Sequence, residues 1–354
     1  MKILVIYPGY GSGVTGGQIY DQYLIERIAK KKEFQVDFIT DYWLWTRKKF
    51  LYPFIYLGKF FVARKYDVVL TNSLTYKRLL PLFVFLRLFS RVKLISIHHH
   101  FFFLENKGIV KRIHKILELL FLKTSYAAII PSPYIKGLFG QFLPRSKCFY
   151  VELGVKKTLK RCTEPKTQTD NNNLLFVGTI EQRKGLIYLI EALNVVNKKE
   201  IPFHCNIVGK KFDENYFQLL EKKIIQFGLQ EKISFCGRVS EEQLSDYYAN
   251  SRCFVFPSLL EGYGMVLIEA MSYGLPVAAF DNSAMPYTIK NGENGLLAEN
   301  ENAELLAKNI AEILTNHALY KKLSDGALHF CNSVRTFENM DKEIDLICQT
   351  RFNI

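Results

Sequence analysis

The chain has 354 residues, which is too long for one ordinary core and suits two domains of ~100–200 residues each. Its seven cysteines are widely spaced and include no Cys-x-x-Cys pair, which argues against a disulfide framework and favours reduced cysteines in the cytosol. The net charge of +13 is uneven, because residues 1–155 hold 24 Lys and Arg against 9 Asp and Glu, whereas the remainder holds 23 against 25. An anionic partner is therefore expected for the first half.

Short β-branched and aromatic runs alternate with longer amphipathic segments along the whole chain. The expected strands cover residues 2–7, 35–40, 66–71, 92–98, 126–131 and 147–152, and then 173–178, 203–209, 232–237, 253–257 and 276–281. Apolar strands that alternate with helices are typical of parallel sheets covered on both faces. The pattern therefore predicts an α/β chain with two successive Rossmann-like domains.

Composition also predicts where the domains begin and end. We expect a first domain at 1–155, a polar linker at 156–173, a second domain at 174–333 and a C-terminal helical segment at 334–354. The first expected strand begins at Lys2, which leaves no room for a cleavable signal sequence. No stretch reaches the ~18 apolar residues of a spanning helix, so a cytoplasmic location is expected.

A glycine-rich loop follows the first expected strand, with glycines at positions 9, 11, 13, 16 and 17. Glycine allows close approach of the backbone to a ligand, and the helix that follows presents unpaired N–H groups, so an anion such as a diphosphate would suit this loop. The dinucleotide fingerprint is incomplete, because Asp37 matches the ribose-binding acid only loosely. A plain structural turn is an equal alternative.

Two basic residues, Arg183 and Lys184, stand between the expected strand at 173–178 and an amphipathic helix. Two cations at such a position can neutralise a diphosphate leaving group as its charge grows. The alternative is a solvated helix start.

Two glutamates, Glu261 and Glu269, flank a short loop and the start of a helix near Met265. Glu269 lies just over one turn into that helix and Glu261 lies outside it, so the two carboxylates need not converge on one bond. They can hold different parts of an extended ligand, and the free N–H groups at the helix start offer an anion site between them.

The Glu-x7-Glu pair in "PSLLEGYGMVLIEAMSYGLPV" resembles the signature of glycosyltransferase family 4, whose members are retaining enzymes with the GT-B fold. The segments "GVTGG", "LISIH", "GTIEQRKG", "NIVGK", "GRVSEEQL" and "NGENGLL" occur in the family's order, so the resemblance covers most of the chain. It implies two Rossmann-like domains that face each other across a deep cleft, with residues 334–354 packing toward the first domain.

The resemblance also implies roles for particular residues in binding a nucleoside diphosphate sugar. Glu269 would hold the ribose hydroxyls, and the backbone around Arg238 and Val239 would clamp the base. The diphosphate would be bound by Arg183, Lys184, Gly16, Gly17, Met265 and Val266, and the transferred sugar would be lined by Glu261, Gly262, Tyr263, Gly264 and His98. The implied catalytic set is His98, Arg183, Lys184 and Glu261.

Two positions depart from the family pattern. Thr179 stands where many members have an arginine, which leaves diphosphate binding to Arg183 and Lys184. Tyr287 stands where a glutamate is common. Both departures bear on donor identity more than on catalysis.

The run His98-His99-His100 raises the possibility of a metal site. On a strand, His98 and His100 could converge while His99 points away. Two imidazoles without a third ligand make a poor zinc site, and no Asp-x-Asp pair is present to hold a metal-bound diphosphate. No metal or other cofactor is therefore expected.

The segment 42–66 holds both tryptophans, many other aromatic residues and no acid. Basic and aromatic residues together suit the headgroup zone of an anionic membrane. A core helix with snorkelling basic ends is the competing interpretation, and a nucleic-acid surface is not favoured because no recognised binding module accompanies it. The residues expected at this membrane or acceptor surface are Trp43, Trp45, Arg47, Lys48, Lys49, Lys59, Arg64 and Lys65.

These features together predict a metal-independent, retaining, hexosyltransferase-type enzyme at the inner face of the cell membrane. It would transfer a sugar from a nucleoside diphosphate sugar to a hydroxyl of a lipid-linked or membrane-proximal glycan. The alternatives are a sugar-nucleotide epimerase or phosphorylase of the same fold, and a non-catalytic basic protein that docks on membrane or nucleic acid.

Overall fold

A computed structural model describes all residues except 8–9, 11–15, 41–51, 156–171 and 353–354. The chain divides into two compact units. Unit 1 comprises Met1–Gly154 together with Arg335–Ile354, and unit 2 comprises Val155–Val334.

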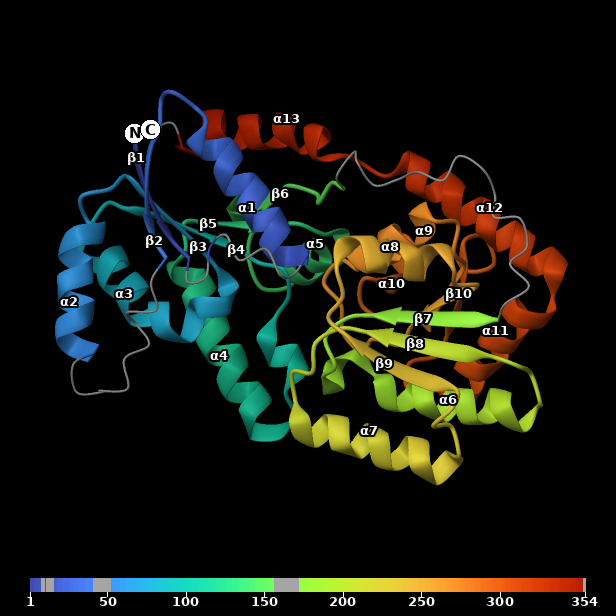
Figure 1. Ribbon diagram of the computed structural model, residues 1–354. Helices are drawn as coiled ribbons and strands as arrows, with labels where there is room; N and C mark the ends of the chain where they lie inside the picture. Colours follow the sequence, from blue (N-terminus) through green and yellow to red (C-terminus); the bar gives the residue numbers. More distant parts are fainter. Residues whose placement is uncertain (8–9, 11–15, 41–51, 156–171, 353–354) are drawn as a thin grey trace. The chain divides into compact units, whose positions relative to one another are not determined.

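Unit 1 is built on a six-stranded parallel sheet in the order β2-β1-β3-β4-β5-β6 (Figure 1). The strands are β1 (Lys2–Ile6), β2 (Gln35–Ile39), β3 (Val68–Asn72), β4 (Lys93–Ile97), β5 (Ala127–Ile130) and β6 (Cys148–Tyr150). The helices are α1 (Gly16–Ala29), α2 (Tyr52–Ala63), α3 (Tyr76–Phe89), α4 (Gly108–Thr124), α5 (Pro133–Phe139) and α13 (Phe337–Ile347).

Unit 2 has a second six-stranded parallel sheet, in the order β12-β11-β10-β7-β8-β9. The strands are β7 (Asn173–Val177), β8 (His204–Val208), β9 (Ile233–Gly237), β10 (Cys253–Phe256), β11 (Val277–Phe280) and β12 (Gly295–Ala298). The helices are α6 (Leu186–Lys198), α7 (Glu214–Phe227), α8 (Glu241–Ala249), α9 (Met265–Ser272), α10 (Met285–Thr288), α11 (Ala303–Thr315) and α12 (His317–Ser333).

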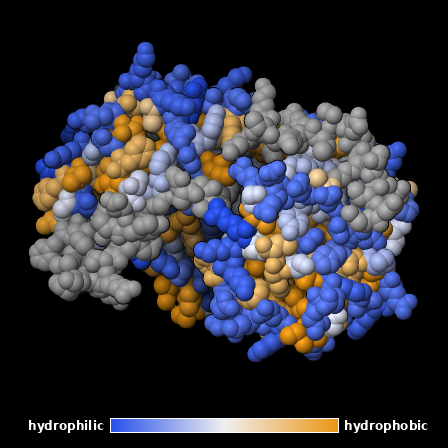
Figure 2. All heavy atoms as spheres, in the orientation of Figure 1, coloured by the Kyte–Doolittle hydropathy of each residue, from blue (hydrophilic) through white to orange (hydrophobic). Residues whose placement is uncertain are grey.

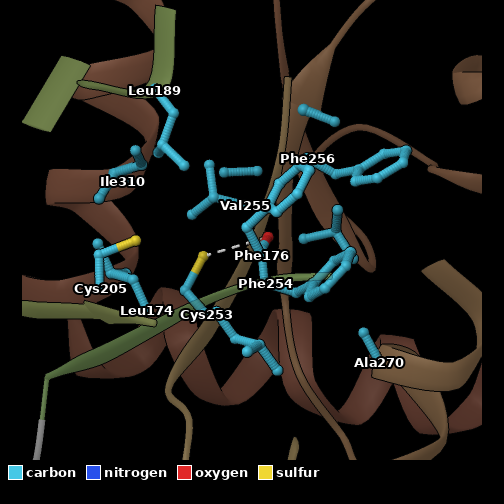
Figure 3. Close-up of a cluster of buried hydrophobic side chains, with 14 of the residues drawn as sticks. Leu174, Phe176, Leu189, Cys205, Cys253, Phe254, Val255, Phe256, Ala270 and Ile310 are labelled. Carbon is cyan, nitrogen blue, oxygen red and sulfur yellow. Dashed lines mark hydrogen bonds between the residues drawn. The ribbon is translucent and has the colours of Figure 1, made fainter. Parts of the chain in front are cut away.

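The central strands are mostly apolar because helices cover both faces of each sheet. In unit 2, α6 packs against α7 and α11, and α9 packs against α12. Figure 3 shows the result around β7 and β10, where Leu189 and Ile310 approach the sheet from one side and Ala270 from the other. Phe254 and Phe256 of β10 are fully buried there. Because both faces of such strands are buried, their sequences do not alternate between apolar and polar residues.

The C-terminal helix α13 belongs to unit 1, where it packs against α1. The rings of Tyr23 and Phe337 stack with their centroids 4.5 Å apart, and the Tyr23 hydroxyl donates to Asp341 over 2.9 Å. Lys31 forms an ion pair with Asp345. Because a Cβ on Gly154 would lie 2.3 Å from the Thr336 carbonyl oxygen, only glycine allows the start of the tail to approach unit 1 this closely.

Each of the eleven expected strands is confirmed, and the α/β fold class is confirmed with them. One strand, β12, was not expected. It begins with Gly295 and follows a turn, and glycine is depleted in strands. Pairing with β11 forms it.

Candidate functional site

The candidate site of unit 2 lies where the strand order reverses. The chain lays down β7, β8 and β9 in one direction and then returns to place β10 on the other side of β7. The loops that follow β7 and β10 therefore diverge at the carboxyl edge of the sheet, which is where open α/β sheets bind ligands. These two loops carry Arg183, Lys184 and Glu261.

Lys184 and Glu261 meet across these loops. The Lys184 Nζ lies 2.6 Å from the Glu261 Oε2, and both side chains are mostly buried. The ammonium also lies 4.7 Å from the centre of the Phe256 ring. Burial lowers the pKa of Lys184, although the neighbouring Glu261 acts in the opposite direction. The pair therefore places one cation and one anion at fixed positions, away from bulk water.

Arg183 is held beside this pair by Glu181 and the Leu260 carbonyl, neither of which the sequence singled out. Its Nη2 donates to the Glu181 Oε1 over 2.8 Å, and its Nη1 donates to the Leu260 carbonyl over 2.8 Å. The Thr179 hydroxyl donates to the same Glu181 oxygen over 2.7 Å. Glu181 thus orients the Arg183 side chain. In the sequence, only its position two residues before Arg183 could have indicated this role.

The glycine between this basic turn and α6 makes the close approach of the two loops possible. Gly185 has φ +68° and ends the 3-10 turn of Gln182–Lys184. A Cβ at Gly185 would lie 2.0 Å from the Pro257 carbonyl oxygen. Its left-handed backbone and lack of side chain are both required here.

The loop of Glu261, Gly262, Tyr263 and Gly264 leads directly into α9. Gly264 has φ +85° and precedes the first helical residue, Met265, with no side chain capping the helix. The N–H groups of the first turn thus point out of the helix start, where an anion is stabilised. The backbone N–H of Glu261 donates to the Ser283 hydroxyl over 3.0 Å, which anchors this loop to the segment after β11.

Glu269 lies on α9 and is half-buried. The hydroxyl of Tyr248, a buried residue of α8, donates to its Oε2 over 3.1 Å. Tyr248 gave no sequence signal, because it reaches Glu269 only through the packing of the two helices on the sheet. Arg238 and Val239 follow β9 on the same carboxyl edge, with the Arg238 side chain exposed.

The resemblance placed His98 beside the transferred sugar, and the structure places its side chain in the core of unit 1. Its ring is fully buried at the end of β4, packed among Phe101, Phe121 and Phe139. Its Nε2 lies 2.9 Å from the Ser96 hydroxyl. Burial lowers the pKa of His98 to about 3, so the imidazole is neutral at pH 7.

His99, the next residue, is only partly buried and contacts a carboxylate of α1. Its Nε2 lies 2.7 Å from the Oδ1 of Asp21, a buried carboxylate on α1 that also accepts from the Tyr7 hydroxyl over 2.7 Å. A Cβ on Gly17 would lie 3.4 Å from the His99 ring, so this glycine leaves room for the imidazole. Asp21 and Tyr7 were missed because nothing in their sequence surroundings distinguishes them from other polar helix and strand-end residues.

His100 does not join the other histidines in a metal site. Its Nε2 lies 3.1 Å from the Glu105 Oε1. Within the residues that the structure describes, no group of three or more His, Cys, Asp or Glu side chains could hold a metal ion.

Glu118 of α4 is a fully buried carboxyl group that holds the segment after the histidines. Its two oxygens accept from the backbone N–H groups of Phe102 and Phe103 over 3.1 and 3.2 Å. Burial is the larger effect and raises the pKa of Glu118 to about 7, although these two hydrogen bonds act to lower it.

This carboxyl predicts a pH-dependent stability. Because the folded protein binds the Glu118 proton more tightly than the unfolded chain, ionisation between about pH 4.5 and about pH 7 lowers the free energy of unfolding as pH rises. We expect the wild type to lose about 2–3 kcal/mol more than Glu118→Gln between pH 5 and pH 8. Urea unfolding of both proteins at the two pH values measures this difference, and equal losses would contradict the assignment.

The predicted membrane segment lies partly outside the described residues, since these exclude Trp43, Trp45, Arg47, Lys48 and Lys49. The described part places Lys59 on α2 and Arg64 and Lys65 directly after it. The Arg64 guanidinium lies 5.1 Å from the centre of the Phe61 ring. In the part of the chain that the structure describes, no helix has the length and hydropathy needed to cross a membrane.

Comparison with protein families matches residues 162–329 to the family described as "Glycosyl transferases group 1". The chain is 27% identical over 240 residues to an uncharacterised 41.2 kDa protein in the cps region of Klebsiella pneumoniae, covering 65% of this chain and 63% of that protein. It is 25% identical over 232 residues to the GDP-mannose:cellobiosyl-diphosphopolyprenol alpha-mannosyltransferase of Xanthomonas oryzae pv. oryzae, covering 65% and 60% respectively. The chain spans less than two thirds of the length of these curated relatives.

Solved structures show the same fold at low sequence identity. The sucrose-phosphate synthase of Thermosynechococcus elongatus has a TM-score of 0.79 and 19% identity, covering 99% of both chains. HepE of Anabaena, solved in complex with UDP and glucose, has a TM-score of 0.75 and 18% identity, covering 99% of this chain and 100% of that chain. The chain therefore has the α/β fold of the GT-B glycosyltransferases, and its second unit is similar to the glycosyl transferases of group 1.

Proposed function

We propose that this protein is a retaining glycosyltransferase of family 4 that binds a nucleoside diphosphate sugar on unit 2 and needs no metal ion. The acceptor is a hydroxyl of a lipid-linked or membrane-proximal glycan. The observation that carries the proposal is the Lys184–Glu261 pair, which lies with Arg183 at the carboxyl edge of the second sheet. The order of the loops supports it, because the basic turn and the start of α9 follow adjacent strands.

The relatives support the substrate classes within this proposal. The HepE structure contains UDP and glucose, and the Xanthomonas relative is named for transfer from GDP-mannose to a diphosphopolyprenol-linked sugar. Both names describe those proteins. Applied to this chain, they favour a nucleotide sugar as donor and a glycan on a lipid diphosphate as acceptor.

The chemistry assigned to the site is stabilisation of charge on the leaving group. In the proposed reaction, the bond between the sugar C1 and the diphosphate oxygen breaks while the acceptor oxygen bonds to C1 on the same face. The acceptor proton passes to an oxygen of the departing phosphate. Arg183 and Lys184 stabilise the negative charge that grows on this phosphate, together with the N–H groups of the first turn of α9. Glu261 keeps the Lys184 ammonium in position before the donor arrives.

Glu269 is expected to affect donor binding more than turnover, because it holds the ribose in this proposal. A thermal-shift screen of nucleoside diphosphate sugars first identifies the donor that stabilises the protein. Glu269→Ala should then weaken its binding by about 10- to 100-fold, as expected when a hydrogen bond to a charged group is lost. Calorimetry measures the affinity.

Tyr248→Phe is the matched control, because it removes only the hydroxyl that donates to Glu269 and leaves the carboxylate in place. A smaller loss of affinity is expected for it. Full donor affinity in Glu269→Ala would show that the ribose assignment is wrong.

Two other enzyme classes make different predictions from the same binding site. A sugar-nucleotide epimerase would convert the donor without any acceptor, whereas a phosphorylase would depend on inorganic phosphate. Product analysis with the identified donor, with and without acceptor or phosphate, distinguishes the three. Absence of binding by every nucleoside diphosphate sugar would favour the non-catalytic docking protein.

A further inference from the structure

Helix α4 has an apolar stripe on the side that faces solvent. Ile109, Ile113, Ile116 and Leu120 follow one another at intervals of four, three and four residues, which places them on one side of the helix. Their exposed fractions lie between 45% and 68%. The opposite side of α4 is already buried through Phe121 and Leu122. The core of unit 1 therefore does not account for this stripe.

The stripe continues across the neighbouring helices. α3 packs against both α4 and α2, so the outward faces of the three helices adjoin (Figure 1). Twelve of the twenty exposed large apolar side chains in the described residues lie on these helices, and Figure 2 shows hydrophobic atoms gathered over α4. Scattered exposed apolar residues are ordinary, but a contiguous patch marks an interaction surface. Beyond α4's stripe and Val110, the patch includes Leu57, Phe61 and Val62 of α2 and Val84, Phe85, Leu88 and Phe89 of α3.

The charges around this patch have one sign. The three helices contain eight lysines and arginines and a single acid, Glu118, which is fully buried and bonded to the backbone. The basic residues are Lys59, Lys77, Arg78, Arg87, Lys111, Arg112, Lys115 and Lys123. A second copy of the chain would present the same positive face and be repelled. Apolar side chains flanked by lysine and arginine, without exposed acid, complement a bilayer that contains anionic lipid.

The position of α4 places the apolar patch near the carboxyl edge of the first sheet. α4 begins just after the segment of His98–Asn106, at the carboxyl edge of the first sheet, and Ile109 lies in its first turn. Glu118 ties that segment to the helix through Phe102 and Phe103. A bilayer on this face would thus bring lipid headgroups close to the edge of unit 1 that carries His99 and Asp21.

We propose that the outward face of α2, α3 and α4 docks unit 1 on an anionic lipid bilayer, with the stripe of α4 inserted among the headgroups. This docking proposal rests on one part of the proposed function, which is that the acceptor is bound to a membrane. This surface overlaps the aromatic segment at 42–66 only on α2, and most of the patch lies on α3 and α4.

Vesicle co-sedimentation of the full chain tests the surface. The probes are vesicles of phosphatidylcholine alone and of phosphatidylcholine and phosphatidylglycerol in equal parts. Wild type should sediment with the anionic vesicles and much less with the neutral ones. Ile113→Ser/Ile116→Ser should lower the partition coefficient by about tenfold or more, because two inserted apolar side chains are lost.

Helix α7 offers a matched control. Leu219 and Ile225 are 50% and 62% exposed, compared with 50% and 60% for Ile113 and Ile116, and they lie in unit 2. Leu219→Ser/Ile225→Ser should leave vesicle binding unchanged. Equal losses in both double variants, or no binding of wild type to anionic vesicles, would overturn the proposal. A dimer of wild type that Ile113→Ser/Ile116→Ser converts to monomer would also overturn it, since the face would then serve self-association.

Donor binding separates this proposal from the enzymatic one. The Ile113→Ser/Ile116→Ser protein should keep the thermal stabilisation by the donor that wild type shows, because unit 2 is unchanged. Lost vesicle binding with retained donor binding supports the docking surface. If wild type bound anionic vesicles but no donor, the proposed function would be refuted, whereas the docking surface would still be supported.

Discussion

Lys184→Ala is expected to lower kcat by about 100- to 1,000-fold, with a smaller effect on donor affinity. In the proposed mechanism this buried cation interacts with the leaving phosphate more strongly as negative charge accumulates there, and removal of one such group typically has this magnitude. Steady-state kinetics with the donor found by thermal shift measures both parameters. Lys322→Ala, an exposed lysine on α12, is the control and should behave as wild type.

A second variant decides whether Lys184 acts on the substrate or only neutralises Glu261. The two side chains lie 2.6 Å apart, so alanine at 184 leaves a mostly buried carboxylate without its lysine. If neutralisation were the whole role, Lys184→Ala/Glu261→Gln would recover activity. We expect no recovery, because the glutamine restores charge balance but not the cation. Recovery to near wild-type turnover would assign Lys184 a structural role.

Gly185→Ala is expected to lower the free energy of unfolding by about 2–4 kcal/mol and to reduce activity with it. Alanine must adopt φ +68°, and its Cβ would lie 2.0 Å from the Pro257 carbonyl oxygen. Either the basic turn or the loop after β10 must shift, and a shift of either separates Lys184 from Glu261. Chemical denaturation measures the stability.

Gly228→Ala separates the cost of a left-handed backbone from the cost of the contact with Pro257. Gly228 ends α7 with φ +65°, but a Cβ there would meet nothing within 4 Å. It therefore carries only the left-handed backbone penalty of about 1 kcal/mol. Equal losses of stability in both variants would show that the contact with Pro257 does not contribute to the free energy of unfolding.

The sequence predicted the strands of this protein well, because most of them are largely buried and contain short runs of β-branched and aromatic residues. β5 shows this most clearly, since all four of its residues are apolar and buried. β12 was missed because it begins with glycine, which is depleted in strands, and follows a turn. The basic turn was also identifiable, since Arg183 and Lys184 directly follow a strand and precede a helix.

The partners of the site residues depended on tertiary structure. The contact of Lys184 with Glu261 joins positions 77 residues apart, and that of Asp21 with His99 joins positions 78 apart. Local sequence carries no information about such pairs until the sheet order is known. His98 shows the same limit, because a polar residue at a strand end can point either to the carboxyl edge or into the core.

The sequence by itself determined the α/β class, the order of strands and helices, and the residue types at the two loops of unit 2. Hydrophobic periodicity and glycine positions are local properties, so a single chain displays them. Only the tertiary structure decided that Lys184 faces Glu261, that Tyr248 holds Glu269, and that α4 keeps an apolar stripe in solvent. Each of these depends on which side of a helix or loop the neighbouring elements cover, and packing between distant segments sets that.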